Sequence, residues 1–153
     1  MHVVLLEPEI PQNTGNIART CLLTNSTLHL IHPLGFKTDE KSLLRSGLDY
    51  WYKVKINYYD NFKHFLEKNN NPKIFIVETN SKNAYTSVSY NENTFFMFGK
   101  ETKGVPKYIL NNYEDTSIYI PMVKGSRSLN LSNAVAIVLY EALRQNNFKN
   151  FHM

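Results

Sequence analysis

The chain has 153 residues, of which 42% are hydrophobic and 20% are charged. This balance is ordinary for a globular protein and excludes an intrinsically disordered chain. The formal net charge of +4 allows an anionic partner such as RNA, although an excess of lysine also fits a plain solvated surface. The length suits a single domain that covers residues 1–153.

Cysteine content and hydropathy bear on the compartment. The single cysteine, Cys21, excludes an internal disulfide framework and is typical of a reducing compartment. No run of residues approaches the ~18 apolar residues of a membrane span, and the N-terminus lacks a basic region followed by an apolar stretch. We therefore expect a cytoplasmic protein.

The first elements in chain order are a strand, a polar turn and a helix. β-Branched residues and leucines predict a buried strand at residues 2–6, which the following Glu-Pro pair ends. Asn13 and Thr14 are expected to cap the helix, and an apolar stripe runs along it: Ile17, Ala18, Cys21 and Leu22. A turn of this kind leaves free amides at a helix N-terminus, which is a natural phosphate site, and Arg19 lies in the first turns.

The rest of the chain continues to alternate between strands and helices. Further strands are expected at residues 27–31, 54–57, 73–78, 94–98 and 117–120. A short helix is expected at residues 39–48 and another after Asp60, with Phe62, Phe65 and Leu66 facing inward. This alternation favours an α/β fold with a mainly parallel sheet, helices on both faces and ligands at the carboxyl ends of the strands.

The segment from residue 118 to residue 141 combines a polar turn with a very apolar helix. Pro121 ends the last strand, and Asn130 or Ser132 can cap a helix over residues 131–144. The apolar residues of this helix form two strips: Ala134, Val135, Val138, Leu139 and Ala142 in one, and Ala136, Ile137, Tyr140 and Leu143 in the other. Two apolar strips favour a helix that packs against a second copy of the chain. A central helix wholly inside one domain is the alternative.

Candidate chemistry gathers after the strand at residues 94–98. Gly99 and Gly104 bracket Glu101, so that the backbone can approach a ligand closely and the carboxylate can accept hydrogen bonds. The same residues also fit an ordinary surface loop. His29 and His32 point to opposite faces of a strand, which argues against a shared metal, and no zinc spacing, P-loop, G-x-G-x-x-G or G-x-S-x-G motif is present.

Three segments together carry a family resemblance. They are P-Q-N-T-G-N-I-A-R at residues 11–19, F-G-K-E-T-K-G at residues 98–104 and I-P-M-V-K-G-S-R-S-L-N-L-S-N-A-V at residues 120–135. In order and spacing they resemble the SpoU/TrmH branch of the SPOUT methyltransferases, and within it the small enzymes that act on the wobble nucleotide of tRNA. The resemblance implies an α/β fold with a deep C-terminal trefoil knot, and a homodimer that packs through the helix of residues 131–144.

The resemblance also implies a cofactor and a set of site residues. The cofactor is S-adenosylmethionine, with S-adenosyl-L-homocysteine as its product and no metal, and it lies among the loops after the last three strands. Positions that match the family's cofactor contacts are Val77, Gly99, Ile120 and Ser128, with Leu129 beside them. Positions that match its catalytic and RNA-facing residues are Asn13, Arg19, Glu101, Ser128 and Asn130.

The implied reaction methylates the ribose 2'-hydroxyl of cytidine or modified uridine at position 34, in the anticodon stem-loop of leucine tRNAs. Arg19 is often assigned as the base in this family, but a guanidinium holds its proton tightly, which makes it a poor base and a good anion partner. Our hypothesis is that Arg19 binds the target phosphate and the developing alkoxide. A different tRNA or rRNA ribose, or a non-catalytic cofactor-binding or RNA-binding module, remains an alternative.

No added RNA-binding domain is visible in the sequence. The dimer itself is therefore expected to hold the RNA through basic residues of both copies: Lys41, Arg45, Lys53, Lys124 and Arg127.

Overall fold

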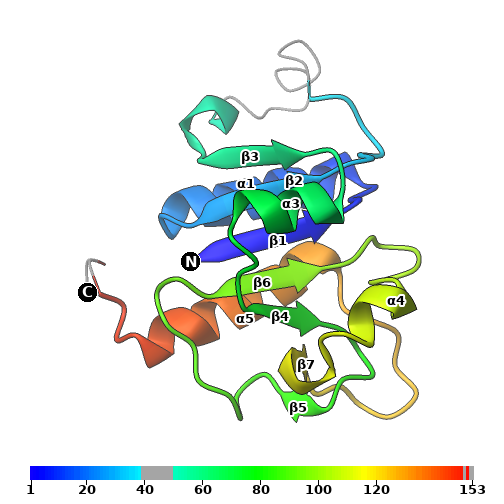
Figure 1. Ribbon diagram of the computed structural model, residues 1–153. Helices are drawn as coiled ribbons and strands as arrows, with labels where there is room; N and C mark the ends of the chain where they lie inside the picture. Colours follow the sequence, from blue (N-terminus) through cyan, green and yellow to red (C-terminus); the bar gives the residue numbers. More distant parts are fainter. Residues whose placement is uncertain (39–49, 150, 152–153) are drawn as a thin grey trace.

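The computed structural model describes residues 1–38, 50–149 and 151, and these residues form a parallel sheet of seven strands in the order β3-β2-β1-β6-β4-β7-β5. The strands are β1 (His2–Leu6), β2 (Thr27–Ile31), β3 (Ile56–Tyr59), β4 (Ile74–Val77), β5 (Asn83–Ala84), β6 (Phe95–Phe98) and β7 (Ser117–Tyr119). Every pairing is parallel, so the carboxyl ends of the strands lie at one edge of the sheet (Figure 1). The predicted α/β class is confirmed.

Helices cover both faces of the sheet, as predicted. α1 (Pro11–Leu23) and α5 (Leu131–Gln145) pack on one face, while α3 (Phe62–Lys68) and α4 (Lys107–Leu110) pack on the other (Figure 1). The short 3-10 helices η1 (Trp51–Lys53) and η2 (Glu114–Thr116) lie in connections.

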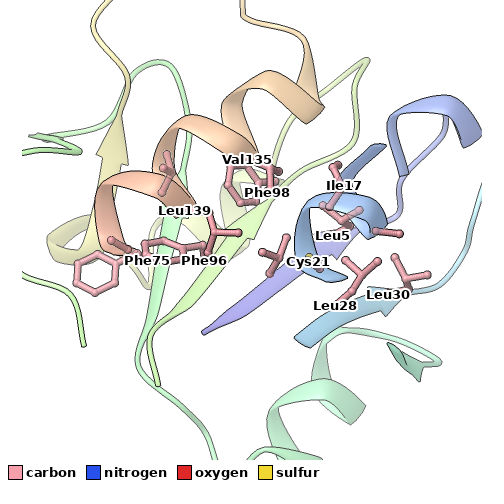
Figure 2. Close-up of a cluster of buried hydrophobic side chains, with 14 of the residues drawn as sticks. Leu5, Ile17, Cys21, Leu28, Leu30, Phe75, Phe96, Phe98, Val135 and Leu139 are labelled. Atoms are coloured by element: carbon pink, nitrogen blue, oxygen red, sulfur yellow. The ribbon is translucent and has the colours of Figure 1, made fainter. Parts of the chain in front are cut away.

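Alternation along the central strands builds two hydrophobic cores. In β6, Phe96 belongs to the cluster under α1 and α5, whereas its neighbour Met97 belongs to the cluster under α3 and α4. Figure 2 shows the first cluster, where Ile17 of α1 and Val135 and Leu139 of α5 lie over the strand side chains. Full burial of one such side chain stabilises the fold by roughly 1.5–3 kcal/mol. This packing therefore holds the carboxyl ends of the strands in place.

Several predicted element boundaries are wrong. α1 begins at Pro11 with Ile10 as its N-cap, so Asn13 and Thr14 lie buried inside the first turn and cap nothing. The cap of α3 is Asn61, whose side chain accepts a hydrogen bond from the His64 amide at 2.9 Å, and not Asp60. The strand expected at residues 54–57 begins two residues later because η1 precedes it.

Other predicted strands agree with the structure to within one residue, and one predicted helix lies outside the described residues. The strands at residues 2–6 and 27–31 are confirmed to the residue, and those at 73–78, 94–98 and 117–120 differ by one residue at an end or at both ends. The helix expected at residues 39–48 lies outside the described residues. The trefoil knot stays a prediction.

α5 is covered on only one of its two apolar sides. Asn130 is its N-cap, as predicted, and accepts a hydrogen bond from the Ser132 amide at 2.9 Å. Val135, Val138, Leu139 and Ala142 are buried, together with Leu143 of the second strip. Ile137 and Tyr140 of that strip are 36% and 46% exposed, so a helix wholly buried inside one chain is wrong. Among the helices of the described residues, none combines the length and apolar character that a membrane span requires.

Candidate active site

A cavity of about 450 Å³ opens at the carboxyl edge of the sheet, where the chain leaves β4, β6 and β7. A volume of this size is in the range of small-molecule sites. The cavity is lined by all five residues expected to contact the cofactor: Val77, Gly99, Ile120, Ser128 and Leu129. Apolar side chains of Phe98, Met122 and Leu131 complete part of its wall.

The loop after β6 folds tightly upon itself. A Cβ at Gly99 would lie 2.1 Å from the Gly104 carbonyl carbon, so no other residue fits at position 99 without a backbone shift. The Gly104 amide donates to the Lys100 carbonyl at 2.8 Å, and Gly104 has a φ of 64°. Both glycines therefore serve the close packing of the loop against itself, and this packing sets the position of Glu101.

Glu101 connects this loop to the start of α1. Its Oε2 accepts a hydrogen bond from the Glu9 amide at 2.8 Å, and its Oε1 accepts from the Ile10 amide at 3.2 Å and from Asn13 Nδ2 at 3.0 Å. Backbone amides that precede a helix are thus held by a carboxylate 91 and 92 residues away in sequence. Glu101 is occupied in holding this turn and is not a free carboxylate.

Asn13 and Asn130 extend the same network across the cavity. Asn130 Nδ2 donates to Asn13 Oδ1 at 2.9 Å, and Asn130 Oδ1 accepts from the amide and the hydroxyl of Ser132. The two asparagines are 117 residues apart in sequence, yet together with Glu101 they form one continuous chain of hydrogen bonds. The structure therefore brings Asn13, Glu101, Ser128 and Asn130 to the cavity wall.

Arg19 is the one predicted site residue that does not line this cavity in the single chain. It is exposed on α1, with its guanidinium carbon 6.0 Å from the centre of the Tyr50 ring. Arg19 lies six positions after Asn13, which places it roughly 9 Å further along the helix axis and on another side. The Tyr50 hydroxyl donates to the Gly15 carbonyl at 2.9 Å, which holds this ring against α1.

Two acidic residues that sequence reasoning missed tie the loops after β1 and β6 together. Glu7 Oε2 lies 2.6 Å from Lys100 Nζ, and this hydrogen bond raises the pKa of Lys100. Glu9 Oε2 accepts hydrogen bonds from the amide and the hydroxyl of Thr102. The signal available was the pair of glutamates that follows the first strand, but their partners lie more than 90 residues away.

The predicted basic residues are only partly described. Lys124 and Arg127 are exposed in the segment that leads to Ser128, beside the cavity. Lys53 lies in η1, with its Nζ 5.6 Å from the centre of the Tyr52 ring. Lys41 and Arg45 lie outside the described residues.

The histidines of the first strands serve the core. His29 Nδ1 lies 2.8 Å from the Tyr59 hydroxyl, and His29 Nε2 lies 2.9 Å from His2 Nδ1. Burial lowers the pKa of His29 to about 3 and that of His2 to about 4. In the part of the chain that the structure describes, no cluster of three or more His, Cys, Asp or Glu side chains could hold a metal ion.

Comparisons with known proteins agree over most of the chain. The model of the SpoU rRNA Methylase family matches residues 1–140. The tRNA (cytidine(34)-2'-O)-methyltransferase of Escherichia coli strain K12 is 47% identical over 146 residues, which cover 95% of this chain and 93% of that protein.

Solved structures give the same result. One that concerns the 2-OH methylation of C/U34 on tRNA is 39% identical with a TM-score of 0.89, and the match covers 97% of both chains. The SpoU methyltransferase AviRb from Streptomyces viridochromogenes, in complex with the cofactor AdoMet, has a TM-score of 0.80 at 22% identity. That match covers 96% of this chain and 58% of that chain and shows a shared fold.

Proposed function

Because the chain belongs to the SpoU rRNA Methylase family, we propose that it transfers a methyl group from S-adenosylmethionine to the ribose 2'-hydroxyl of the wobble nucleotide of tRNA. The nucleotide is cytidine or modified uridine at position 34, and leucine tRNAs are the expected substrates. One observation carries the proposal: the Glu101–Asn13–Asn130 network stands at the wall of a cavity that all five expected cofactor residues line.

The cavity fits the adenosyl part of the cofactor. Its apolar wall, formed by Val77, Ile120 and Leu129, suits a flat ring, and backbone groups of the loop at Gly99 stand next to that wall. When bound, the cofactor supplies a methyl group on a cationic sulfur. The residues that would hold it are Val77, Gly99, Ile120, Ser128 and Leu129.

The chain's own residues act mainly by positioning. Glu101 fixes the turn before α1 and orients Asn13, which in turn orients Asn130. In the described part of the chain, the Ser128 hydroxyl forms no hydrogen bond, so it is available to the nucleotide or the cofactor. Holding the ribose hydroxyl in line with a methyl group removes much of the entropic part of the barrier. The Arg19 guanidinium would bind the target phosphate and stabilise the developing alkoxide.

Arg19 does not line the cavity of its own chain, so a second copy is the candidate to supply it there. The exposed side of α5, with Ile137 and Tyr140, supports a homodimer through this helix, and α1, which carries Arg19, packs beside α5. We infer that Arg19 of one protomer acts at the cavity of its partner. Co-expression of an Arg19→Ala chain with an Asn130→Ala chain tests this arrangement.

The mixed dimer separates the two possible arrangements. If Arg19 acts across the interface, one of the two cavities in each mixed dimer has both wild-type residues, and each mixed dimer, once purified, has roughly half of the wild-type turnover. If Arg19 acts within its own chain, both cavities carry a defect and no activity returns. Sedimentation of the Ile137→Asp chain as a dimer would argue against the α5 interface itself.

RNA binding would rest on exposed cations beside the cavity and on the partner. Lys124 and Arg127 precede Ser128 in an exposed segment, so we propose that they contact phosphates near the target nucleotide. Lys53, Lys41 and Arg45 are the other proposed contacts. Each phosphate contact makes the affinity fall with salt, and a Michaelis constant for tRNA that ignores salt would exclude this mode of binding.

The function is tested by methyl transfer in vitro. The purified protein, with labelled S-adenosylmethionine, is incubated with tRNA and separately with rRNA from cells that lack this protein, and the product nucleosides are mapped. Label in 2'-O-methylated nucleotide 34 of leucine tRNAs is expected. Label at another ribose would favour a different RNA substrate, and tight cofactor binding without transfer to any RNA would favour a non-catalytic module.

A further inference from the structure

Glu78 is a second carboxylate at the wall of the cavity, and it belongs neither to the Glu101 network nor to the residues predicted from the sequence. It follows Val77, the last residue of β4, and it is half-buried. It lines the same cavity as Val77, Gly104 and Ile120. Its place directly after an apolar wall residue puts a charged acceptor next to the flat apolar part of the site.

The loop after β6 is shaped to admit this side chain. Glu78 Oε2 accepts a hydrogen bond from the Val105 amide at 3.2 Å, and a Cβ at position 104 would lie 2.3 Å from the same oxygen. Glu78 Oε1 accepts from the amide and the hydroxyl of Thr79, at 2.9 and 3.2 Å. The carboxylate is therefore held in one place by Val105 and Thr79, and Gly104 leaves it room.

This carboxylate keeps unused acceptor capacity. A carboxylate offers about four acceptor positions, and Glu78 uses three of them, two on Oε1 and one on Oε2. No ion pair of the described residues includes Glu78. The vacant position is on Oε2, the atom that lies against Gly104 at the cavity wall.

We propose that Glu78 determines specificity for the cofactor by accepting a hydrogen bond from a ribose hydroxyl of its adenosyl group. This inference rests on the proposed function. An apolar wall next to a fixed carboxylate suits a base followed by its sugar, and acidic side chains at strand ends bind ribose hydroxyls in other nucleotide sites. The cofactor's ammonium group is the other donor that a carboxylate could take, and the test separates the two.

The test measures ligand binding by calorimetry and needs no methyl transfer. The ligands are S-adenosylhomocysteine, 5'-methylthioadenosine, which has no ammonium group, and the 2'-deoxy and 3'-deoxy forms of 5'-methylthioadenosine. The proteins are the wild type, Glu78→Gln, and Glu114→Gln as a matched control on an exposed glutamate that does not line the cavity. Thermal unfolding checks that each variant is folded.

We expect Glu78→Gln to weaken S-adenosylhomocysteine and 5'-methylthioadenosine by the same factor, about 10- to 100-fold. One of the two deoxy ligands lacks the ribose hydroxyl that Glu78 binds, and wild type and Glu78→Gln should bind that ligand equally weakly. Glu114→Gln should match the wild type throughout.

Two results overturn the inference. An equal loss for every ligand, both deoxy forms included, would mean that Glu78 only positions the loop. A loss for S-adenosylhomocysteine but not for 5'-methylthioadenosine would assign Glu78 to the ammonium group. A wild-type protein that binds none of these ligands would refute the proposed function itself, which is a distinct outcome because it does not depend on the variant.

Discussion

Replacing Glu101 by glutamine tests whether this carboxylate positions the site or transfers a proton. It accepts hydrogen bonds from the amides of Glu9 and Ile10 and from Asn13 Nδ2, between 2.8 and 3.2 Å. Glutamine keeps the length of the side chain but has one acceptor oxygen, so its amide group must face at least one of these donors. Hydrogen bonds to charged groups contribute roughly 1.5–3 kcal/mol, and water can replace the exposed bond to Ile10. We expect Glu101→Gln to lower the free energy of unfolding by ~1–3 kcal/mol.

Two measurements on the same variant distinguish the roles. Urea unfolding gives the stability, and the rate of methyl transfer as a function of pH gives the titration of the essential groups, with Glu114→Gln as a control. For a positioning residue, stability and turnover fall together and the shape of the pH profile is unchanged. A loss of turnover beyond ~100-fold at unchanged stability, or a lost limb of the profile, would refute the positioning role.

Three further predictions concern the loop, the arginine and pH. Gly99→Ala should lower the free energy of unfolding by ~2 kcal/mol or more, because its Cβ would lie 2.1 Å from the Gly104 carbonyl carbon. Gly125→Ala, with open space around it, should lower the same free energy by only ~1–2 kcal/mol. Urea unfolding measures both, and equal losses would contradict this. Arg19→Lys keeps the charge but loses the fork, so turnover should fall at least ~10-fold, and near-wild-type turnover would argue against the role. Because burial lowers the pKa of His29 to about 3 and of His2 to about 4, the unfolded chain binds protons below about pH 6.5 that the folded chain does not. Stability should therefore fall by up to ~1–2 kcal/mol per pH unit from about pH 6.5 toward pH 4, and His2→Gln should reduce that slope.

The sequence predicted the sheet because buried parallel strands have a strong local signal. The runs at β1 and β2 are apolar and bounded by turn residues, so their ends could be located closely. β5 has two residues and α4 has four, which is too short for either periodicity to show. Asn61 in place of Asp60 as the cap of α3 is a choice between two good capping residues, and only the extended backbone at Asn61 decides it.

The sequence singled out most of the residues that meet at the cavity, but not the hydrogen bonds that connect them. Asparagine often caps helices, and the sequence predicted that role for Asn13, but α1 begins two residues earlier, at Pro11. The side chain of Asn13 is instead used by Glu101 and Asn130, at separations of 88 and 117 residues. Glu78 meets its partner Val105 from 27 residues away, and no pattern within a short window of the chain signals its fit against Gly104.

The polar groups at the cavity divide into those that are used within the protein and those that are left over. The acceptor atoms of Glu101 and the side-chain amides of Asn13 and Asn130 are bound to one another or to backbone amides, so removing any one of them leaves a donor or an acceptor without its partner. Such a network is rigid, and it can hold the loops after β1 and β6 and the start of α5 in one arrangement. The Ser128 hydroxyl, the side chains of Lys124 and Arg127, and one acceptor position of Glu78 remain for ligands. It follows that substitutions in the network should reduce stability and turnover together, whereas substitutions of Ser128, Lys124 or Arg127 should change affinity and leave stability unchanged.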